Sequence, residues 1–147
     1  MKHPKFYQGH YNPANKDKYK GKYPITFRSS WEYNLALFCD KNPSIITWAM
    51  ESAVVQYVDP TRSNTVHNYL IDFTMTVKDK NNNIQKYYVE VKPFKETTQP
   101  IKGKKKEQTF LIESLTFARN ISKWKAAKIF AEKKGAKFIV LTEKDLF

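Results

Sequence analysis

The chain has 147 residues, a length that suits one domain with a sizeable hydrophobic core. Lysine and arginine number 26 against 14 aspartates and glutamates, a formal net charge of +12 at pH 7, which favours a polyanionic partner, above all nucleic acid. No apolar stretch has membrane-spanning length and no signal-peptide core is apparent, so we expect a soluble protein that is not exported. The single cysteine, Cys39, excludes an intrachain disulfide and a cysteine-based zinc site and should be a small buried side chain.

The N-terminal segment is expected to be a basic arm over residues 1–24, followed by a folded domain over 25–147. The arm is rich in lysine, tyrosine, asparagine and glycine, and prolines interrupt any regular period. Its tyrosines Tyr7, Tyr11 and Tyr19 would either anchor the arm on its own domain, which we favour, or stack on the bases of a nucleic acid.

Residues 29–40 are predicted to form an amphipathic helix, because Trp31 and Leu35 begin an apolar stripe at helical spacing. Glu32 lies at the edge of this stripe, where a carboxylate needs a reason. Two explanations remain open. Either Ser29 and Glu32 form a capping box, or Glu32 supplies a carboxylate to a metal site on a neighbouring sheet.

The next segments are predicted to begin a sheet. Residues 45–48 read as a short apolar step, residues 53–58 as a first strand, and residues 59–65 as a turn into a long second strand. Glu51, just before the first strand, fits an ordinary polar residue at a strand entrance better than a rim residue of a site.

A hairpin around Asp72 and Glu90 is the central prediction. Alternation places Asp72 on the face opposite the apolar side chains of its strand, and places Glu90 and Lys92 together on one face of the next strand. The connecting loop, residues 79–83, is rich in residues that tolerate left-handed backbone. Asp72 should therefore lie beside Glu90, with Lys92 close by.

This group of side chains suits metal-dependent hydrolysis of a phosphodiester. Two carboxylates offer the hard oxygen ligands that Mg²⁺ prefers. A lysine can orient the attacking water and offset the charge that develops on the phosphate. Taken alone, the pattern of Glu90 and Lys92 is weak, since an exposed strand end in a lysine-rich chain often carries such a solvated pair.

A basic loop follows the hairpin, and its clustered lysines could hold phosphates that flank a scissile one or could simply be solvated. These lysines are Lys102, Lys104, Lys105 and Lys106. Residues 107–134 are predicted to be helical, as one helix or as two joined near Asn120, with Gly135 as the C-cap. Lys123 of this segment is a further candidate for DNA contact. Residues 137–142 are predicted to form a buried strand.

The order of elements is therefore α-β-β-β-α-β, and the last strand should pair in parallel with a strand of the meander. We expect a mixed α/β fold with a restriction-endonuclease-like core. This order, together with Asp72 and the Glu90-Val91-Lys92 motif, resembles the PD-(D/E)xK nuclease superfamily. The usual proline before the aspartate is replaced by isoleucine, which leaves the metal ligand itself in place.

A narrower resemblance, over residues 19–146, is to the head completion nucleases of T-even-type tailed bacteriophages and, more widely, to the TnsA-type endonucleases. The segments that carry it include Arg28-Ser-Ser-Trp-Glu32, Ile46-Thr-Trp48, Glu51, Tyr57, Asp72-Phe73, Glu90-Val-Lys92-Pro93, Asn120, Lys123-Trp124 and Phe138-Ile-Val-Leu-Thr-Glu143. The resemblance implies catalytic roles for Glu32, Asp72, Glu90 and Lys92, the carboxylates as Mg²⁺ ligands. It also implies a role in processing packaged DNA ends and preparing the head for tail attachment, with phage head or portal proteins as partners, in the host cytoplasm or in the virion head.

These observations lead to one hypothesis and two rivals. The hypothesis is a Mg²⁺-dependent DNA endonuclease, with Mn²⁺ as an alternative metal, in which the Val91 carbonyl joins the carboxylate ligands. Its basic surface, poor in arginine, should bind DNA largely without reading sequence. The first rival is a non-catalytic DNA-binding adaptor at the phage head portal. The second, a histidine-metal nuclease, is disfavoured because His3, His10 and His67 are scattered along the chain.

Overall fold

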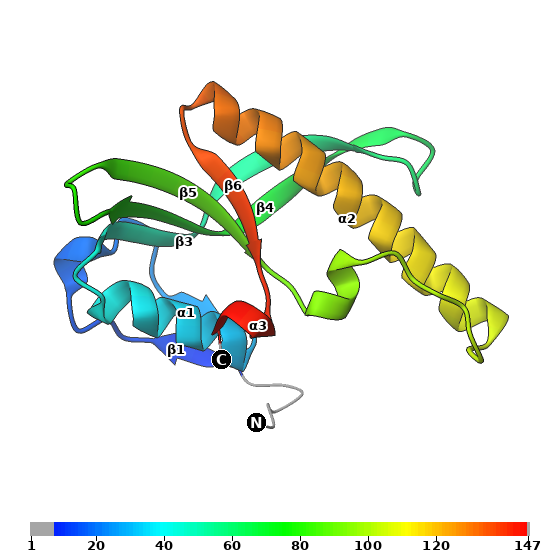
Figure 1. The fold of residues 1–147 in the computed structure, drawn as a ribbon, viewed down its shortest axis with the longest axis horizontal. Coiled ribbons are helices and arrows are strands. Elements are labelled where there is room, and N and C mark those ends of the chain that lie inside the picture. Colours follow the sequence, from blue (N-terminus) through cyan, green and yellow to red (C-terminus); the bar gives the residue numbers. More distant parts are fainter. Residues whose placement is uncertain (1–7, 147) are drawn as a thin grey trace.

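The computed structural model describes residues 8–146, which form a mixed α/β fold (Figure 1). A four-stranded sheet has the order β3-β4-β5-β6, and a small two-stranded sheet pairs β1 with β2. The elements are β1 (Gly9–Tyr11), the 3-10 turn η1 (Lys16–Lys18), β2 (Ile25–Phe27), α1 (Ser30–Lys41), β3 (Ile45–Asp59), β4 (Thr65–Lys78), β5 (Ile84–Val91), the 3-10 turn η2 (Phe94–Thr97), α2 (Glu107–Lys133), β6 (Lys137–Leu141) and α3 (Glu143–Leu146).

The predicted order of elements is confirmed. Strands β3, β4 and β5 form an antiparallel meander, and β6 returns after α2 to pair in parallel with β5. The loop between β4 and β5 has the predicted left-handed residue, Asn82, with φ 63°. The Asp79 carboxylate stabilises this loop by accepting hydrogen bonds from the backbone N–H groups of Asn81 at 2.8 Å and Asn83 at 2.9 Å.

Strand β3 corrects the prediction of a short step followed by a separate strand. It runs without interruption over Ile45–Asp59, and its register with β4 shifts between Met50 and Ala53. Glu51 lies at this β-bulge with φ 49°, inside the strand rather than at its entrance. A bulge lets a strand continue while it bends and twists more strongly. The polar Glu51-Ser52 pair that looked like a break therefore marks a bend.

The N-terminal segment packs on the rest of the chain, as favoured from the sequence. Tyr11 and Tyr19 are buried in the same core cluster as Trp48, at 7% and 6% exposure. The buried Asp40 of α1 accepts hydrogen bonds from the Tyr11 hydroxyl at 2.6 Å and from the Ala14 N–H at 2.8 Å. These contacts also hold the short strand β1, which the sequence did not predict. Tyr7 lies outside the described residues.

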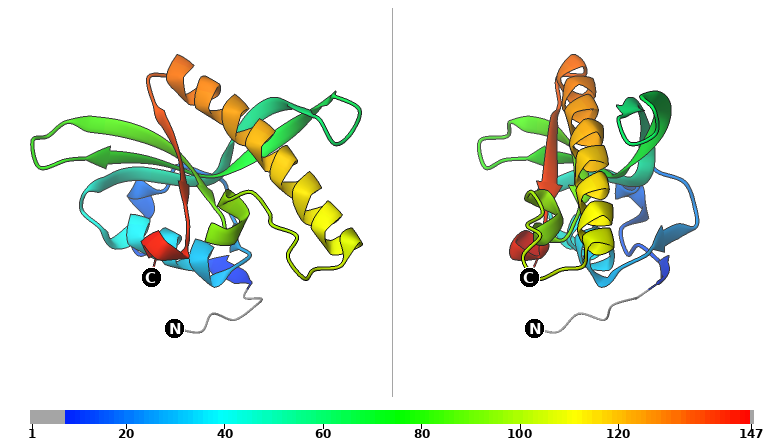
Figure 2. Two further views of the ribbon diagram at one scale, coloured as in Figure 1. Left: turned by 45° about the vertical axis from the view of Figure 1, so that its right-hand side comes forward. Right: turned by 90° about the vertical axis from the view of Figure 1, so that its right-hand side faces the viewer.

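Helix α2 is one helix, which resolves the alternative of two joined near Asn120. It ends in the predicted glycine motif: Gly135 has φ 68°, and the Ala136 N–H donates to the Ala131 carbonyl at 2.9 Å. Its C-terminal half buries Ala127 and Ala131 against the sheet. Its N-terminal half leans away from the sheet and leaves Leu111 exposed (Figure 2). No helix in the described part of the chain is long and apolar enough to cross a membrane.

Strand β6 is less buried than predicted. It is the edge strand of the sheet, and its side chains from Phe138 to Leu141 are half-buried rather than fully buried. Its apolar composition predicted a buried strand, and among the described residues β6 pairs along one edge only, with β5. Cys39 is fully buried, as expected from the sequence.

Candidate active site

The candidate site lies where β4 and β5 separate. Their pairing ends at Phe73 and Val89, although β4 continues beside β3 to Thr65 and β5 continues beside β6 to Val91. The next residues along the two strands are Asp72 and Glu90. The strands diverge in Figures 1 and 2, where the β3–β4 arm turns away from β5. Functional side chains can therefore occupy the space between two strands that are held firmly by their other neighbours.

Asp72 is the first residue of β4 beyond the end of its backbone pairing with β5. Its Oδ2 accepts a hydrogen bond from the Val91 N–H at 2.8 Å, so a side-chain carboxylate takes the place of a backbone carbonyl. The pKa of Asp72 is raised well above its ordinary range, mainly by burial and then by the neighbouring Glu90 carboxylate. Glu90 itself is only 3% exposed. The predicted proximity of Asp72 and Glu90 is thus present.

Glu32 reaches the same group of carboxylates from α1. The Ser29 hydroxyl caps the helix by accepting from the Glu32 N–H at 3.1 Å, while Glu32 Oε1 accepts from the Arg28 N–H at 3.2 Å. The predicted cap is therefore present, although the glutamate reaches one residue beyond the N-cap amide. Burial and, as the next largest cause, the charge of the Asp72 carboxylate together raise the pKa of Glu32 to about 7. Both explanations offered for Glu32 are compatible with this position.

The chemistry of this group suits a divalent cation. The Asp72 carboxylate raises the pKa of Glu32, and the Glu90 carboxylate raises the pKa of Asp72, because like charges repel across a poorly solvated space. A bound cation would relieve that repulsion. Carboxylate oxygens are the ligands that Mg²⁺ prefers. Among residues 8–146, no three histidine, cysteine, aspartate or glutamate side chains are yet close enough to form a ready-made metal cluster. The donor set fits a metal ion, but its side chains would have to draw together.

Lys92 follows β5 directly and is tethered by its backbone, whose N–H donates to the Leu141 carbonyl at 3.0 Å. Its positive charge partly opposes the rise in the pKa of Asp72, and it lowers the pKa of Lys123. The ammonium of Lys92 therefore interacts electrostatically with Asp72 and with Lys123 of α2, and its catalytic role stays a prediction.

Lys123 enters the same region from α2. Its ammonium lies 5.5 Å from the ring centroid of Tyr69 and 5.7 Å from that of Tyr57, an arrangement that favours cation–π attraction. Burial lowers the pKa of Lys123, and the charge of Lys92 lowers it further, whereas Glu90 opposes this shift. The sequence predicted a DNA contact here without knowing the direction of the side chain. The structure turns Lys123 toward the carboxylates, and DNA contact stays a prediction.

Tyr69 is a residue that the sequence did not single out. It is 4% exposed, and its hydroxyl has no hydrogen-bond partner within the described residues. Burial raises its pKa, and Glu90 and Asp72 raise it further, so its hydroxyl lies near both carboxylates. Alternation assigned Tyr69 to the apolar core, and an unpaired hydroxyl leaves no signature in a sequence pattern.

Glu51 lies at the rim of this site. It forms an ion pair with Arg28, whose Nη1 lies 2.8 Å from Glu51 Oε1 and whose backbone N–H donates to Glu32. The charge of Glu51 contributes to the raised pKa of Glu32. The bulge in β3 thus turns Glu51 toward the helix N-terminus. This position corrects the expectation of an ordinary residue at a strand entrance.

The predicted basic loop lies beside the N-terminal half of α2. Lys102 pairs with Glu107 at 3.5 Å, and Lys105 pairs with Glu113 at 2.7 Å. Lys104 is exposed, as is Lys106. Part of the positive charge of the loop is thus balanced locally, and its contact with DNA stays a prediction.

The histidines of the described chain belong to different places in the fold. His10 Nδ1 lies 3.3 Å from the Thr26 hydroxyl in the small sheet, and His67 Nε2 lies 2.7 Å from the Thr65 hydroxyl at the far end of β4. These separate locations continue to disfavour a histidine-metal nuclease. His3 falls outside the described residues.

Comparison with known proteins agrees with the fold. The family model described as TnsA-like endonuclease N terminal matches residues 42–143, a range that includes Asp72, Glu90 and Lys92. The chain is also 39% identical over 145 residues to the head completion nuclease of Enterobacteria phage T4, a match that covers 95% of this chain and 93% of that protein. Both findings confirm the resemblance stated from the sequence, and the chain belongs to the TnsA-like endonuclease family.

Proposed function

We propose that this protein is a Mg²⁺-dependent endonuclease that hydrolyses DNA phosphodiesters. The observation that carries the proposal is the separation of β4 from β5 at Asp72, whose carboxylate bonds to the Val91 N–H beside Glu90. Glu32 is electrostatically coupled to the same carboxylate from α1. Acidic side chains from α1, β4 and β5 thus influence one another electrostatically in a basic domain, an arrangement that fold stability alone does not require and that supports the proposal.

The residues proposed to hold the metal are Glu32, Asp72, Glu90 and the Val91 carbonyl, with Mn²⁺ as an alternative to Mg²⁺. When bound there, the metal would polarise phosphate oxygens and lower the pKa of a water molecule. The hydrogen bond from the Val91 N–H holds the Asp72 carboxylate in one orientation before any ligand arrives. This preorganisation lowers the cost of forming the site.

Lys92 is proposed to position the attacking water and to offset charge on the phosphate. Lys123 and the Tyr69 hydroxyl would approach the phosphate from α2 and β4. Both can donate hydrogen bonds to phosphate oxygens. Cation–π contacts with Tyr57 and Tyr69 keep the Lys123 ammonium near the site.

The protein is proposed to bind DNA through the phosphates of the DNA backbone. The lysines assigned to this contact are Lys102, Lys104, Lys105, Lys106 and Lys123. A formal net charge of +12 supports strong, salt-dependent attraction to DNA. Lysine supplies almost all of this charge and does not form the rigid bidentate contacts by which arginine reads guanine, so binding should be largely independent of sequence.

The biological setting is proposed from the relative named a head completion nuclease. By that likeness the protein would process the ends of packaged DNA and prepare a phage head for tail joining. Head or portal proteins would be its partners, and it would work in the host cytoplasm during assembly or in the virion head. The second candidate function is a DNA-binding adaptor without catalysis, favoured by the lack of a ready-made metal cluster among the described side chains.

A plasmid-nicking assay tests the proposal. Wild-type protein should relax and then linearise supercoiled DNA in Mg²⁺ or Mn²⁺ and be inactive in EDTA. Lys92→Ala should abolish cutting yet bind DNA with nearly unchanged affinity. The matched control is Lys80→Ala, which removes the same charge from the exposed hairpin loop. Unchanged cleavage by Lys92→Ala would remove that residue from the mechanism. DNA binding by the wild type without cleavage in either metal would favour the adaptor.

A further inference from the structure

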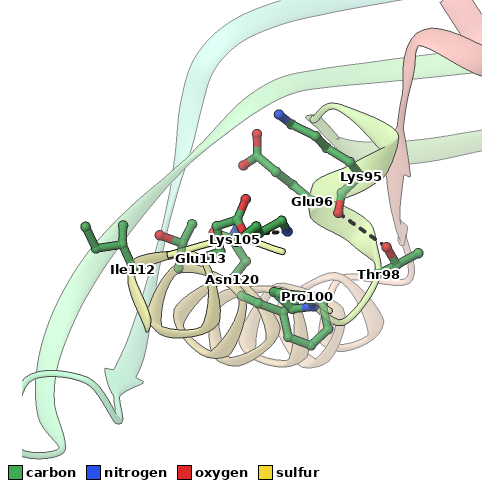
Figure 3. A pocket seen from close by; sticks show the side chains of 10 residues that line it. Lys95, Glu96, Thr98, Pro100, Lys105, Ile112, Glu113 and Asn120 are labelled. Carbon is green, nitrogen blue, oxygen red and sulfur yellow. Dashed lines mark hydrogen bonds and ion pairs between the residues drawn. The ribbon is translucent and has the colours of Figure 1, made fainter. Parts of the chain in front are cut away.

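A pocket lies between the η2 segment and the N-terminal half of α2 (Figure 3). The residues that line it do not include Glu32, Asp72 or Glu90. One wall comes from the loop that follows β5, and the other comes from successive turns of α2. The side chains used in the argument below are Lys95, Pro100, Lys105, Ile112, Phe117 and Asn120. No function assigned so far uses this pocket.

Asn120 is the unusual member of the lining. Its side chain is 3% exposed, and its Nδ2 has no hydrogen-bond partner within the part of the chain that the structure describes. Buried amide groups are nearly always hydrogen-bonded, because leaving a donor unpaired away from water is costly. The pocket therefore presents an unused donor that a ligand with an acceptor atom could satisfy.

The pocket adjoins the candidate active site. Asn120 and Lys123 are three residues apart on α2 and therefore lie on the same side of the helix, about one turn from each other. Lys95 lies in η2, which begins two residues after Lys92. A strand whose phosphate lay between Lys92 and Lys123 would thus have a neighbouring nucleotide close to this pocket.

The chemistry of the lining favours a flat, neutral group over a bare anion. Phe117, Pro100 and Ile112 supply apolar surface, and Asn120 supplies the amide. Two carboxylates, Glu96 and Glu113, also line the pocket, and Glu113 already pairs with Lys105 at 2.7 Å. Because Lys95 and Lys105 balance these two carboxylates, the lining has no excess positive charge with which to hold a free phosphate inside the pocket.

A nucleobase meets each of these conditions. Its faces stack on an aromatic ring and on apolar surface, its edge carries acceptor atoms for an amide donor, and its phosphates stay outside the pocket. Lys95, which is exposed at the pocket, could meet those phosphates. A base can enter only if it is unpaired, because a duplex hides both its faces and its pairing edge.

We propose that this pocket receives an unpaired nucleobase of the DNA strand next to the scissile phosphodiester. The preferred substrate class would then be DNA with unpaired terminal nucleotides, such as an overhang or a flap, rather than a continuous duplex. The inference rests on the proposed function only in taking DNA as the substrate. It adds a contact to the base that the carboxylate site does not make.

Binding can be measured without cleavage, in EDTA, with the full-length protein. The probes are a blunt duplex and the same duplex with a short 3′ or 5′ overhang that carries 2-aminopurine. Wild-type protein should bind at least one overhang about tenfold more tightly than the blunt end and should change the 2-aminopurine fluorescence as the base stacks. Ile112→Trp should fill the pocket and remove both effects while leaving the affinity for blunt DNA within about twofold.

The matched control is Leu111→Trp. Ile112 and Leu111 are neighbours on α2 and are each 56% exposed, but only Ile112 lines the pocket. Leu111→Trp should behave as wild type. Asn120→Leu, checked for an unchanged melting temperature, should also lose the preference for the overhang. Free deoxynucleotides should compete poorly, because they lack the neighbouring phosphates.

The possible results separate the two proposals. An overhang preference that survives both Ile112→Trp and Asn120→Leu would overturn the pocket assignment. So would equal binding of blunt and overhanging DNA by the wild type, or competition by free nucleotides at the concentration of the overhang probe. A pocket-dependent preference in a protein that never cuts DNA in Mg²⁺ or Mn²⁺ would support the pocket and reject the nuclease.

Discussion

Arg119 of α2 donates a hydrogen bond from Nε to Oδ2 of Asp59 at 3.0 Å, across 60 residues of sequence. Asp59 ends β3 with a side chain that is 0% exposed. Arg119 also donates from Nη2 to the Thr61 hydroxyl at 2.9 Å. The far end of the β3–β4 arm is therefore attached to the helix that carries Lys123, and the candidate site lies further along β4, where this strand leaves β5.

Arg119→Ala should destabilise the fold, because it leaves the buried Asp59 carboxylate without its main cation. We expect the melting temperature to fall by roughly 6–12 °C. Arg62→Ala is the matched control: Arg62 Nε also approaches Asp59 Oδ2, at 3.4 Å, but its side chain is 55% exposed. Its loss should change the melting temperature by no more than about 2–4 °C. Equal effects of the two variants would show that Arg119 does not stabilise the arm through Asp59.

The same pair predicts a response to acid. Burial alone would raise the pKa of Asp59, but hydrogen bonds from Thr61 and the charge of Arg119 lower it overall. A carboxyl with a lowered folded-state pKa contributes stability above its unfolded pKa and loses it as the pH falls through the folded value. The difference in stability between wild type and Arg119→Ala should thus shrink below about pH 4. Denaturant titrations at pH 7 and pH 3 measure this, and a constant difference would contradict it.

Glu32 predicts the opposite pH dependence. Its pKa rises from 4.5 to about 7 in the folded protein, mainly through burial. A carboxyl with a raised folded-state pKa contributes stability below its unfolded pKa and loses it as the pH rises through the folded value. The melting temperature without metal should therefore decline between pH 4.5 and 7, and the decline should be smaller in Glu32→Gln.

The effect of Mg²⁺ on the melting temperature provides a second test of the role of Glu32. If Glu32 binds Mg²⁺, the ion should raise the melting temperature more at pH 8 than at pH 5, because the metal competes with protons for ionised carboxylates. Glu32→Gln should weaken this effect. A Mg²⁺ effect that is independent of pH and of Glu32 would remove this carboxylate from the metal site.

Tyr69→Phe should separate function from stability. Its hydroxyl makes no hydrogen bond within residues 8–146, so its removal should leave the melting temperature unchanged or slightly raised. If the hydroxyl donates to a phosphate oxygen, cleavage should fall by roughly ten- to hundredfold. Tyr57→Phe is the matched control, because Tyr57 also lies under Lys123 but its pKa responds to Asp59 rather than to Glu90 or Asp72. Equal losses of activity would point to an indirect effect on Lys123.

The basic loop can be tested through salt dependence. Lys104→Ala with Lys106→Ala removes two exposed charges, and a contact between these lysines and phosphates predicts a decrease of about 2 in the slope of log affinity against log salt concentration. Lys41→Ala with Lys80→Ala removes the same charge from the end of α1 and the hairpin loop and should change the slope less. The measurement is fluorescence anisotropy in EDTA across a salt series. Identical slopes for both double variants would mean that the loop makes no special contact.

Much of the candidate site could be predicted from local sequence. Alternation along two strands placed Asp72 opposite Glu90 and put Lys92 on the same side, because the period of a strand allows no other arrangement once the hairpin register is known. The N-cap at Ser29 and the glycine motif at Gly135 were likewise predictable, since each depends on a few consecutive residues.

The predicted strand boundaries and strand burial were wrong where one local sequence pattern was compatible with two structures. Glu51 and Ser52 looked like a break between two apolar runs, but they form a bulge in one long strand. Strand β6 was expected to be buried from its composition, but it lies at the edge of the sheet and its side chains are at most half-buried. Whether a polar pair ends a strand or bends it depends on the neighbouring strand that supplies hydrogen bonds on either side, and no local pattern contains that information.

The sequence by itself determined the order of the elements, the faces of each strand and the acidic and basic side chains that the site could use. Only the tertiary structure decided that β4 leaves β5 at Asp72 and that α1 brings Glu32 near the same carboxylate. It also decided that α2 turns Lys123 toward the carboxylates and Asn120 toward the pocket beside η2. Periodicity describes one element at a time. The meeting of faces depends on sheet twist and on contacts between residues far apart in the chain, such as Asp59 and Arg119.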